Sequence, residues 1–305
     1  MVRAHNDGMP QHATPGLDRT GLIAGSAAYL WWGLAAFYWV PAKVVGPVDL
    51  LAHRALWAAP FCAVLLLVRG RLVRALGALR VPRNALLLGA SAALVALNWG
   101  IFLHAMGQSR LAEASLGYFM QPLVAVLIGL IGFSERLTPL QWISVGFATA
   151  GVAVYTTALG HLPLVAIGVS VSFGLYGAVR RLVKVDSLDG LFVETVLLAP
   201  LALGWILWHD GAGLGLHGVR VDAILLGAGA FTAIPLLGYI EAARRLPMIA
   251  LGLLFYINPT VQLLVAVFGF GEPLQPAAVW SFSLVWTGVV LYLAQTLLRR
   301  RFGPG

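Results

Sequence analysis

Long apolar runs separated by short polar segments account for most of the chain. Residues 1–20 are polar and contain no apolar run. Ten apolar runs follow, at about 21–40, 47–68, 85–106, 111–133, 139–158, 163–179, 189–208, 223–243, 247–270 and 276–298. A membrane-spanning helix needs about 20 mostly apolar residues, and the runs do not alternate apolar with polar positions as spanning strands do. The pattern therefore predicts an all-α integral membrane protein with ten transmembrane helices.

The two halves of the chain repeat each other. At an offset of 137 residues, Pro122, Gly132, Phe133, Glu135, Leu137, Pro139, Ser144, Gly151, Val152 and Tyr155 recur as Pro259, Gly269, Phe270, Glu272, Leu274, Pro276, Ser281, Gly288, Val289 and Tyr292. At an offset of 140, Asp49, Leu51, Ala59 and Pro60 recur as Asp189, Leu191, Ala199 and Pro200. Five helices per half is an odd number, so the second copy enters from the opposite face of the membrane. Such inverted repeats are typical of secondary transporters.

The repeat predicts how the chain divides. We expect a first five-helix repeat over 21–158 and a second over 163–298. The remaining segments, 1–20 and 299–305, are expected to be an N-terminal and a C-terminal tail on the cytoplasmic side.

Basic residues indicate how the chain is oriented. When the 20 Lys and Arg residues are assigned to alternate sides, sixteen fall on the side of the N-terminus, three on the other, and Arg54 lies within a run. Cytoplasmic loops carry the positive excess, which predicts a multi-pass protein of the cytoplasmic (inner) membrane with both termini in the cytoplasm. The net charge of +8 comes from residues at the ends of apolar runs, so nucleic acid is not an expected partner.

Composition excludes several chemistries. Hydrophobic residues make up 60% of the chain and charged residues 10%, against about 25% charged in an ordinary soluble domain. Cys62 is the single cysteine, so an internal disulfide and a multi-cysteine metal site are impossible. The motifs H-E-x-x-H, G-x-S-x-G and G-x-x-x-x-G-K-[ST] are absent from the sequence. We therefore expect no enzyme activity and no cofactor.

Arg54 is the first candidate functional residue, because ionisable groups in hydrocarbon are costly. It lies about seven residues inside the second run, beside His53. The two residues could attract an anionic or polar group of a substrate, or gate the external side. In the alternative interpretation Arg54 extends to the membrane surface or pairs with Asp49.

Glu194 occupies the position in the second half that corresponds to Arg54. The inverted repeat places Arg54 toward the external third of the membrane and Glu194 toward the cytoplasmic third, so a salt bridge between them is not assumed. Burial without a partner would favour the protonated carboxyl and suit a proton-coupling site. A partner on a neighbouring helix is the alternative.

Two runs carry an amide and a proline at mid-depth, Gln121 with Pro122 and Asn258 with Pro259. Proline removes a helical hydrogen bond and kinks the helix. We expect these segments to line the centre of the molecule near the repeat interface, together with Tyr118, Phe119, Phe255 and Tyr256; packing alone is the alternative.

Three further polar or aromatic positions have simpler interpretations. Asn98 lies near mid-membrane, where an amide either joins two helices or lines a pathway. Trp32 lies within the first run and not near its ends, so it is a candidate lining residue, although core packing is the commoner role. Glu241 precedes Arg244 and Arg245 by three and four residues, which predicts ion pairs along one helix face.

The segments LLAHRALW, LNWGIFLHA, RLAEASLGYFMQPL and SERLTPLQW, within an inverted repeat, resemble the RarD group of the EamA transporters. That group belongs to the drug/metabolite transporter superfamily, and the resemblance extends over about 21–298. It implies a ten-helix carrier with a central cavity and alternating access. His53, Arg54, Asn98, Glu113, Tyr118, Phe119, Pro122 and Glu194 match the group's strings. Gln121 stands where the group usually has Asn, and Ser134 where it usually has Gly.

The sequence as a whole predicts a secondary active transporter that moves a small metabolite or drug-like solute by alternating access. Its expected partners are that solute, the lipid bilayer and a coupling proton, and Glu194 or a histidine would couple the proton. Two other classes remain open. One is a membrane receptor or scaffold that transports nothing, and the other is an intramembrane enzyme acting on lipid-linked substrates.

Overall fold

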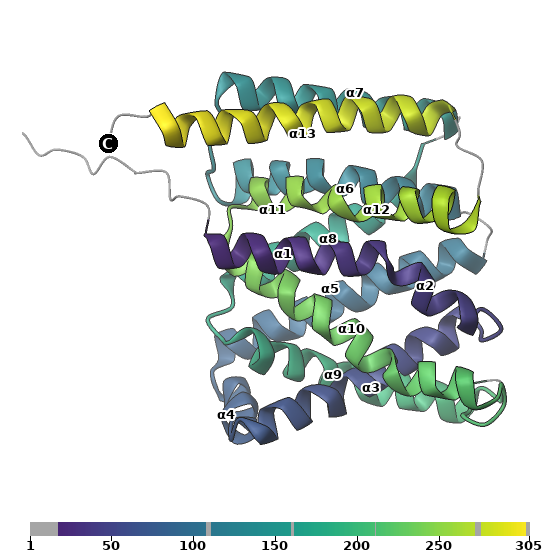
Figure 1. Ribbon diagram of the computed structural model, residues 1–305. Coiled ribbons are helices and arrows are strands. Elements are labelled where there is room, and N and C mark those ends of the chain that lie inside the picture. Colours follow the sequence, from purple (N-terminus) through teal and green to yellow (C-terminus); the bar gives the residue numbers. More distant parts are fainter. Residues whose placement is uncertain (1–17, 108–110, 160–161, 211, 272–275, 303–305) are drawn as a thin grey trace, which may run out of the picture.

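The computed structural model of the chain describes residues 18–107, 111–159, 162–210, 212–271 and 276–302, and within these ranges it contains helices and no strand (Figure 1). Most of the predicted N-terminal tail and the end of the predicted C-terminal tail lie outside the described residues. The prediction of an all-helical protein is therefore confirmed for the part that is described.

The helices follow the apolar runs closely. Their bounds are α1 Arg19–Gly33, α2 Ala35–Trp39, α3 Pro47–Val68, α4 Leu72–Gly77, α5 Pro82–Gly107, α6 Leu111–Gly132, α7 Pro139–Leu159, α8 Leu164–Leu182, α9 Ser187–Trp208, α10 Val219–Arg245, α11 Met248–Phe255, α12 Ile257–Leu264 and α13 Pro276–Phe302. Short 3₁₀ turns cover Val40–Ala42 and Ala78–Arg80, and a π turn covers Val265–Gly269.

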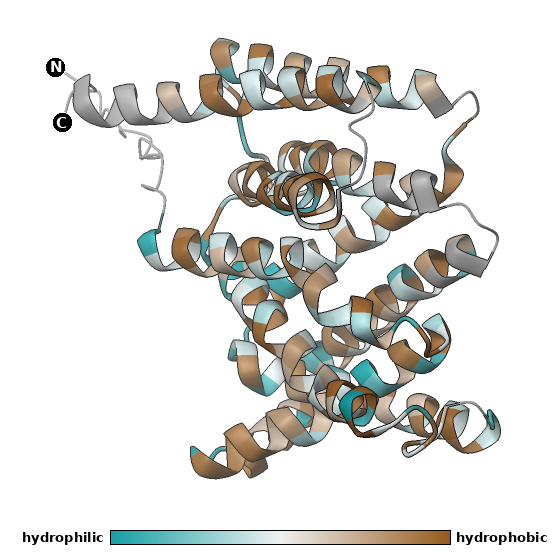
Figure 2. Cartoon of the chain, turned by 45° about the vertical axis from the view of Figure 1, so that its right-hand side comes forward, coloured by the Kyte–Doolittle hydropathy of each residue, from teal (hydrophilic) through white to brown (hydrophobic). Residues whose placement is uncertain are grey.

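By length and apolar composition, six helical segments in the described part could cross a membrane. They become seven if α1 and α2, which bend by 46° relative to each other, form one span. The chain is thus a multi-pass membrane protein. Large apolar side chains such as Val68 and Phe268 are 83% exposed, and Figure 2 shows hydrophobic residues along all the helices. Such exposed apolar side chains suit contact with lipid.

Prolines within the predicted spans do not always coincide with helix breaks. Pro259 lacks an N–H, and its ring crowds the carbonyl four residues earlier, which belongs to Phe255; α11 ends at that residue. Pro122 instead lies inside an unbroken α6. The break between α1 and α2 comes at Leu34, directly after Gly33.

Helix pairing brings corresponding segments of the two halves together (Figure 1). The helices α7 and α13 form an outer layer, α6 packs on α11 in the next, and α3 packs on α9 at the opposite side of the bundle. The remaining principal pairs are α1 with α10, α5 with α8, α6 with α8, α1 with α12, α3 with α10, α5 with α9, and α8 with α10.

The pair α7 and α13 is held at close range by two glycines. A Cβ added to Gly151 would lie 2.8 Å from the carbonyl oxygen of Ser281. A Cβ added to Gly288 would lie 2.5 Å from the carbonyl oxygen of Ser144. Any larger residue at either position would force the two backbones apart. The offset of 137 relates Gly151 to Gly288 and Ser144 to Ser281, so the two contacts are equivalent.

Candidate functional site

A small cavity lies at the centre of the bundle, between α3, α5, α8, α9 and α10. Its polar lining comes from Tyr176, Glu194, Thr195 and Thr232. The rest of its wall is apolar and consists of Ala58, Val95, Trp99, Leu191, Leu198, Ala233 and Leu236. The cavity is narrow, so a solute of metabolite size requires the walls to move apart.

Arg54 does not line this cavity itself but lies behind its wall, in contact with two lining residues, Thr232 and Trp99. Its Nε donates a hydrogen bond to Thr232 Oγ1 at 3.0 Å. The guanidinium carbon lies 5.2 Å from the ring centre of Trp39 and 5.6 Å from that of Trp99. No carboxylate in the described part of the chain forms an ion pair with Arg54. The proposed pair with Asp49 is therefore not present.

Glu194, in contrast, lines the cavity itself and is buried. Arg180 Nη1 contacts Glu194 Oε1 at 3.1 Å, Tyr176 donates its hydroxyl to Oε2 at 3.2 Å, and Ser91 donates to Oε1. Glu194 therefore has a partner on a neighbouring helix, which was the second of the two alternatives considered for it. No direct pair joins Glu194 to Arg54, as the inverted repeat predicts.

Arg180 is the functional candidate that sequence reasoning missed. It was counted among the charges at the ends of runs, yet its side chain is completely buried. A Cβ added to Gly190 would collide with the Arg180 guanidinium, so the glycine one turn before Glu194 leaves room for this group. The four-residue spacings from Tyr176 to Arg180 and from Gly190 to Glu194 are the signals that could have found the pair.

His53 does not enter the cavity lining. Trp57 Nε1 donates to His53 Nδ1 at 3.1 Å, so Nε2 carries the proton and donates to the Ala212 carbonyl oxygen at 2.7 Å. Both ring nitrogens are thus engaged, and the ring ties α3 to the segment between α9 and α10.

The predicted amides take different roles. Asn98 Nδ2 on α5 donates to the Val169 carbonyl oxygen at 2.8 Å and to Ser172 Oγ at 3.0 Å, both on α8. It therefore joins two helices. Asn258 Oδ1 accepts from Gln262 Nε2 at 2.9 Å on the same helix. Gln121 lines a second, smaller pocket, and its buried Oε1 has no hydrogen-bond partner in the described part of the chain.

The predicted aromatic residues divide between the centre and one side of the bundle. The rings of Tyr118 and Phe255 stack with centres 6.2 Å apart. Phe119 instead packs against Tyr155 and Phe282, on the side of α7 and α13. Tyr256 donates its hydroxyl to the Phe119 carbonyl oxygen at 3.3 Å.

Trp32 and Pro122 pack against neighbouring helices. The ring of Trp32 lies 5.9 Å from that of Phe173 and 6.0 Å from that of Tyr239. A Cβ on Gly252 would lie 2.9 Å from the Pro122 carbonyl oxygen, so α6 and α11 approach closely there. The side chain of Glu113 lies outside the described residues.

Aspartates clamp α3 and α9 together at both ends. At the end of the bundle that we call the Arg71 end, Asp189 at the start of α9 contacts Arg71 at 2.9 Å and Arg74 at 3.3 Å. At the opposite end, the His209 end, Asp49 at the start of α3 accepts from Trp205 Nε1 at 2.8 Å and contacts His209 Nδ1 at 2.9 Å. Asp49 and Asp189 are repeat equivalents, so the two clamps correspond to each other.

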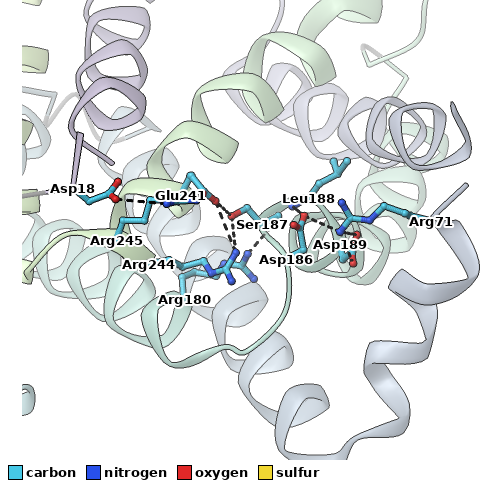
Figure 3. Close-up of polar contacts among 10 residues, drawn as sticks. All are labelled: Asp18, Arg71, Arg180, Asp186, Ser187, Leu188, Asp189, Glu241, Arg244 and Arg245. Carbon is cyan, nitrogen blue, oxygen red and sulfur yellow. Dashed lines mark hydrogen bonds and ion pairs between the residues drawn. The ribbon is translucent and has the colours of Figure 1, made fainter. Parts of the chain in front are cut away.

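Charged groups continue across the Arg71 end (Figure 3). Glu241 contacts Arg245 at 2.5 Å and Arg244 at 3.8 Å, which confirms the predicted pairs, and it also accepts from Ser187. Burial by itself raises the pKa of Asp186, but the Leu188 N–H, the hydrogen bond from Arg71 and its charge lower that pKa overall. At this end, ion pairs therefore join α4 to α9 and, through Asp18 and Arg245 at 3.7 Å, α1 to α10, while hydrogen bonds of Ser187 join α9 to α10.

Comparisons with known proteins agree with this arrangement. The EamA-like transporter family matches residues 19–157. The chain is 34% identical to an uncharacterized transporter of Vibrio cholerae over 90% of this chain and 92% of that one. It is 37% identical to protein RarD of Streptomyces exfoliatus, with coverages of 90% and 88%. It is 34% identical to the chloramphenicol-sensitive protein RarD of Pseudomonas aeruginosa, with coverages of 85% and 89%.

A solved crystal structure has the same fold, with a TM-score of 0.71, 21% identity, and coverage of 91% of this chain and 98% of that one. The relatives are similar over most of their own length, and the family match covers the first half of the chain. The chain therefore belongs to the EamA-like transporter family, in its RarD group, within the drug/metabolite transporter superfamily.

Proposed function

We propose that this protein is a secondary active transporter that moves a small metabolite or drug-like solute across the cytoplasmic membrane by alternating access. The observation that carries the proposal is the cavity, which Glu194 lines and whose wall Arg54 contacts at Thr232 and Trp99; the two residues lie on equivalent helices, α9 and α3. Transporters built from inverted repeats place their substrate site near the midplane at the repeat interface.

The proposal includes ten transmembrane helices in two five-helix halves, over 21–158 and 163–298. Helix pairing supports it, because all the principal contacts except α8 with α10 map onto each other when the halves are exchanged. The pair α3 with α9, for example, maps onto itself, and α1 with α10 maps onto α5 with α8. The reciprocal contacts of Gly151 and Gly288 support the same relation.

The two clamps give the halves a way to move. Each fastens one end of the α3 and α9 pair, with the cavity between them. Opening one clamp while the other stays closed would expose the cavity to one side only. We place the Arg71 end in the cytoplasm with both termini, because basic residues gather there.

A proton is the proposed coupling ion, bound by Glu194 or a histidine. Glu194 lines the cavity and is held by Arg180, Tyr176 and Ser91. Movement of α8 against α9 would separate the carboxylate from Arg180 and favour its protonation. The residues predicted to contact solute, namely Trp32, His53, Arg54, Asn98, Tyr118, Phe119, Gln121, Pro122, Glu194, Tyr256, Asn258 and Pro259, form part of the proposal.

Two steps test the function. Purified protein is first screened by thermal shift against amino acids, nucleosides, other metabolites and chloramphenicol at pH 6 and pH 8, because a ligand that binds the native state stabilises it. Each hit is then followed as a labelled solute in proteoliposomes, with and without a pH gradient. We expect the unsubstituted protein to exchange the solute and Arg54→Ala not to exchange it. In Glu194→Gln, we expect exchange that no longer responds to the pH gradient. Unchanged exchange in both variants would contradict the roles proposed for Arg54 and Glu194, and binding without any exchange would contradict the transporter and favour a receptor or scaffold.

A further inference from the structure

The cavity and the side chains behind its wall carry one unbalanced positive charge. Glu194 and Arg180 neutralise each other. Arg54, behind the wall formed by Thr232 and Trp99, has no carboxylate partner among the described residues. The other wall residues bring no further charge. The net charge of the site in this conformation is therefore +1.

The environment of Arg54 leaves most of its hydrogen-bonding capacity unused. A guanidinium has five N–H donors, and Thr232 Oγ1 is the acceptor bonded to it among the described residues. The flanking rings of Trp39 and Trp99 stabilise the charge through their π faces but accept no conventional hydrogen bond. Thr232 and Trp99 also line the cavity. A ligand in the cavity therefore touches two of the side chains that contact Arg54.

The apolar part of the wall selects against a polar body. Ala58, Val95, Leu198 and Leu236 offer no hydrogen bonds. A solute with many hydroxyl groups would leave them unpaired against these side chains, at a cost of about 1–3 kcal/mol for each group. An apolar or aromatic body loses nothing there.

We propose that the substrate is an organic monoanion with an apolar body, whose acid group pairs with Arg54 while its body lies along the wall toward Tyr176. This inference rests on the proposed function, since it assigns the solute of that same cavity. A guanidinium binds a planar or tetrahedral oxyanion through two parallel hydrogen bonds. A second acid group would find no free cation, and an organic cation would face Arg54 without a counter-charge.

Sulfonates test this inference because their charge does not change with pH. The probes are benzenesulfonate and naphthalene-2-sulfonate, their neutral sulfonamides, benzene-1,3-disulfonate, and the cation phenyltrimethylammonium. Binding to the purified full-length chain is measured by thermal shift and titration calorimetry at pH 7.5. We expect each monosulfonate to bind at least tenfold more tightly than its sulfonamide, the disulfonate and the cation.

Variants of Arg54 give the second arm. Arg54→Gln should remove the preference for sulfonate over sulfonamide, and Arg54→Lys should retain it. The matched control is Arg136→Gln, an exposed arginine between α6 and α7, which should leave the preference unchanged. Equal binding of sulfonate and sulfonamide, absence of sulfonate binding, or a preference that persists in Arg54→Gln would each overturn the inference.

Transport of the bound probe separates this inference from the proposed function. Labelled naphthalene-2-sulfonate crosses a bilayer poorly on its own, so its exchange in proteoliposomes reports the protein. Binding that depends on Arg54 without exchange would contradict the transporter and leave the assigned ligand class standing. Exchange of a neutral solute without any sulfonate binding would support the transporter and contradict the assigned ligand class.

Discussion

Arg54 and Glu194 show how equivalent positions can serve opposite chemistry. Glu194 is enclosed by Arg180, Tyr176 and Ser91. Arg54 has a hydroxyl and two indole rings but no counter-ion among the described residues. The pair at Glu194 keeps one end of the cavity neutral, and the single charge at Arg54 is left to act on a solute.

The buried ion pair predicts an asymmetry between single and double variants. Arg180→Leu leaves the Glu194 carboxylate uncompensated and should lower the free energy of unfolding by about 3–5 kcal/mol. The double variant Arg180→Leu with Glu194→Leu should recover most of that loss, because no charge then remains buried. Denaturation in detergent, followed by circular dichroism, measures both. A loss in the double variant equal to or larger than that in Arg180→Leu would contradict the claim that the uncompensated carboxylate causes the loss.

Arg54, Glu194 and Arg180 also show what the sequence could reveal at this scale. An ionisable residue inside an apolar run stands out, so Arg54 and Glu194 were found. Arg180 lies near the end of a run beside Arg181, where basic residues are normally in contact with water, and its burial depends on Gly190 of another helix. Which of the two arginines turns inward is decided by packing, which the local sequence does not encode.

Acid should weaken the Arg71 end through Asp186. The pKa of this carboxyl is lowered in the folded chain by the Leu188 N–H and Arg71, against the opposing effect of burial. A lowered pKa means that the carboxylate contributes stability above its unfolded pKa of about 3.9 and loses it as pH falls through the lower folded value. Asp186→Asn should therefore flatten the fall in melting temperature below about pH 4, as followed by thermal unfolding. An unchanged acid profile in the variant would refute this contribution.

At the scale of helices, the two aspartate clamps on α3 and α9 predict opposite effects of equivalent substitutions. Asp49→Asn weakens the contact with His209, and Asp189→Asn weakens those with Arg71 and Arg74. The first should widen the His209 end alone, and the second the Arg71 end alone. Spin labels at Val48 and Trp208 report one end, and pulsed electron paramagnetic resonance gives their distance. Widening at the same end in both variants would rule out two separate clamps.

The apolar runs predicted helix extents well and helix breaks poorly. The second run was predicted at 47–68, and α3 covers Pro47–Val68. The ninth run, 247–270, was predicted as one kinked helix but forms α11, α12 and a π turn. The first run breaks at Leu34 without any proline. Hydropathy indicates which segments lie in the membrane, whereas helix breaks depend on local backbone strain and on neighbouring helices.

At the scale of the whole molecule, the internal repeat predicted which segments correspond but not which ones touch. That α7 packs on α13, and α3 on α9, comes from the structure. The contacts of Gly151 with Ser281 and of Gly288 with Ser144 explain why glycine occurs at both equivalent positions. Length and apolar composition alone support six spans, or seven with the bent pair, in the described part; the proposal of ten rests on the symmetry of the pairing.

The central claim is that the cavity opens alternately to the two sides of the membrane. Its most direct test places a cysteine at Ala58, which lines the cavity, in a Cys62→Ala background. The control is a cysteine at Ala28, which is buried in the core and does not line the cavity. A membrane-impermeant maleimide is applied to right-side-out and to inside-out vesicles, and labelling is followed over time. We predict that the cysteine at position 58 is labelled from each side and that at position 28 from neither. Labelling of position 58 from one side only, or from neither, would contradict alternating access.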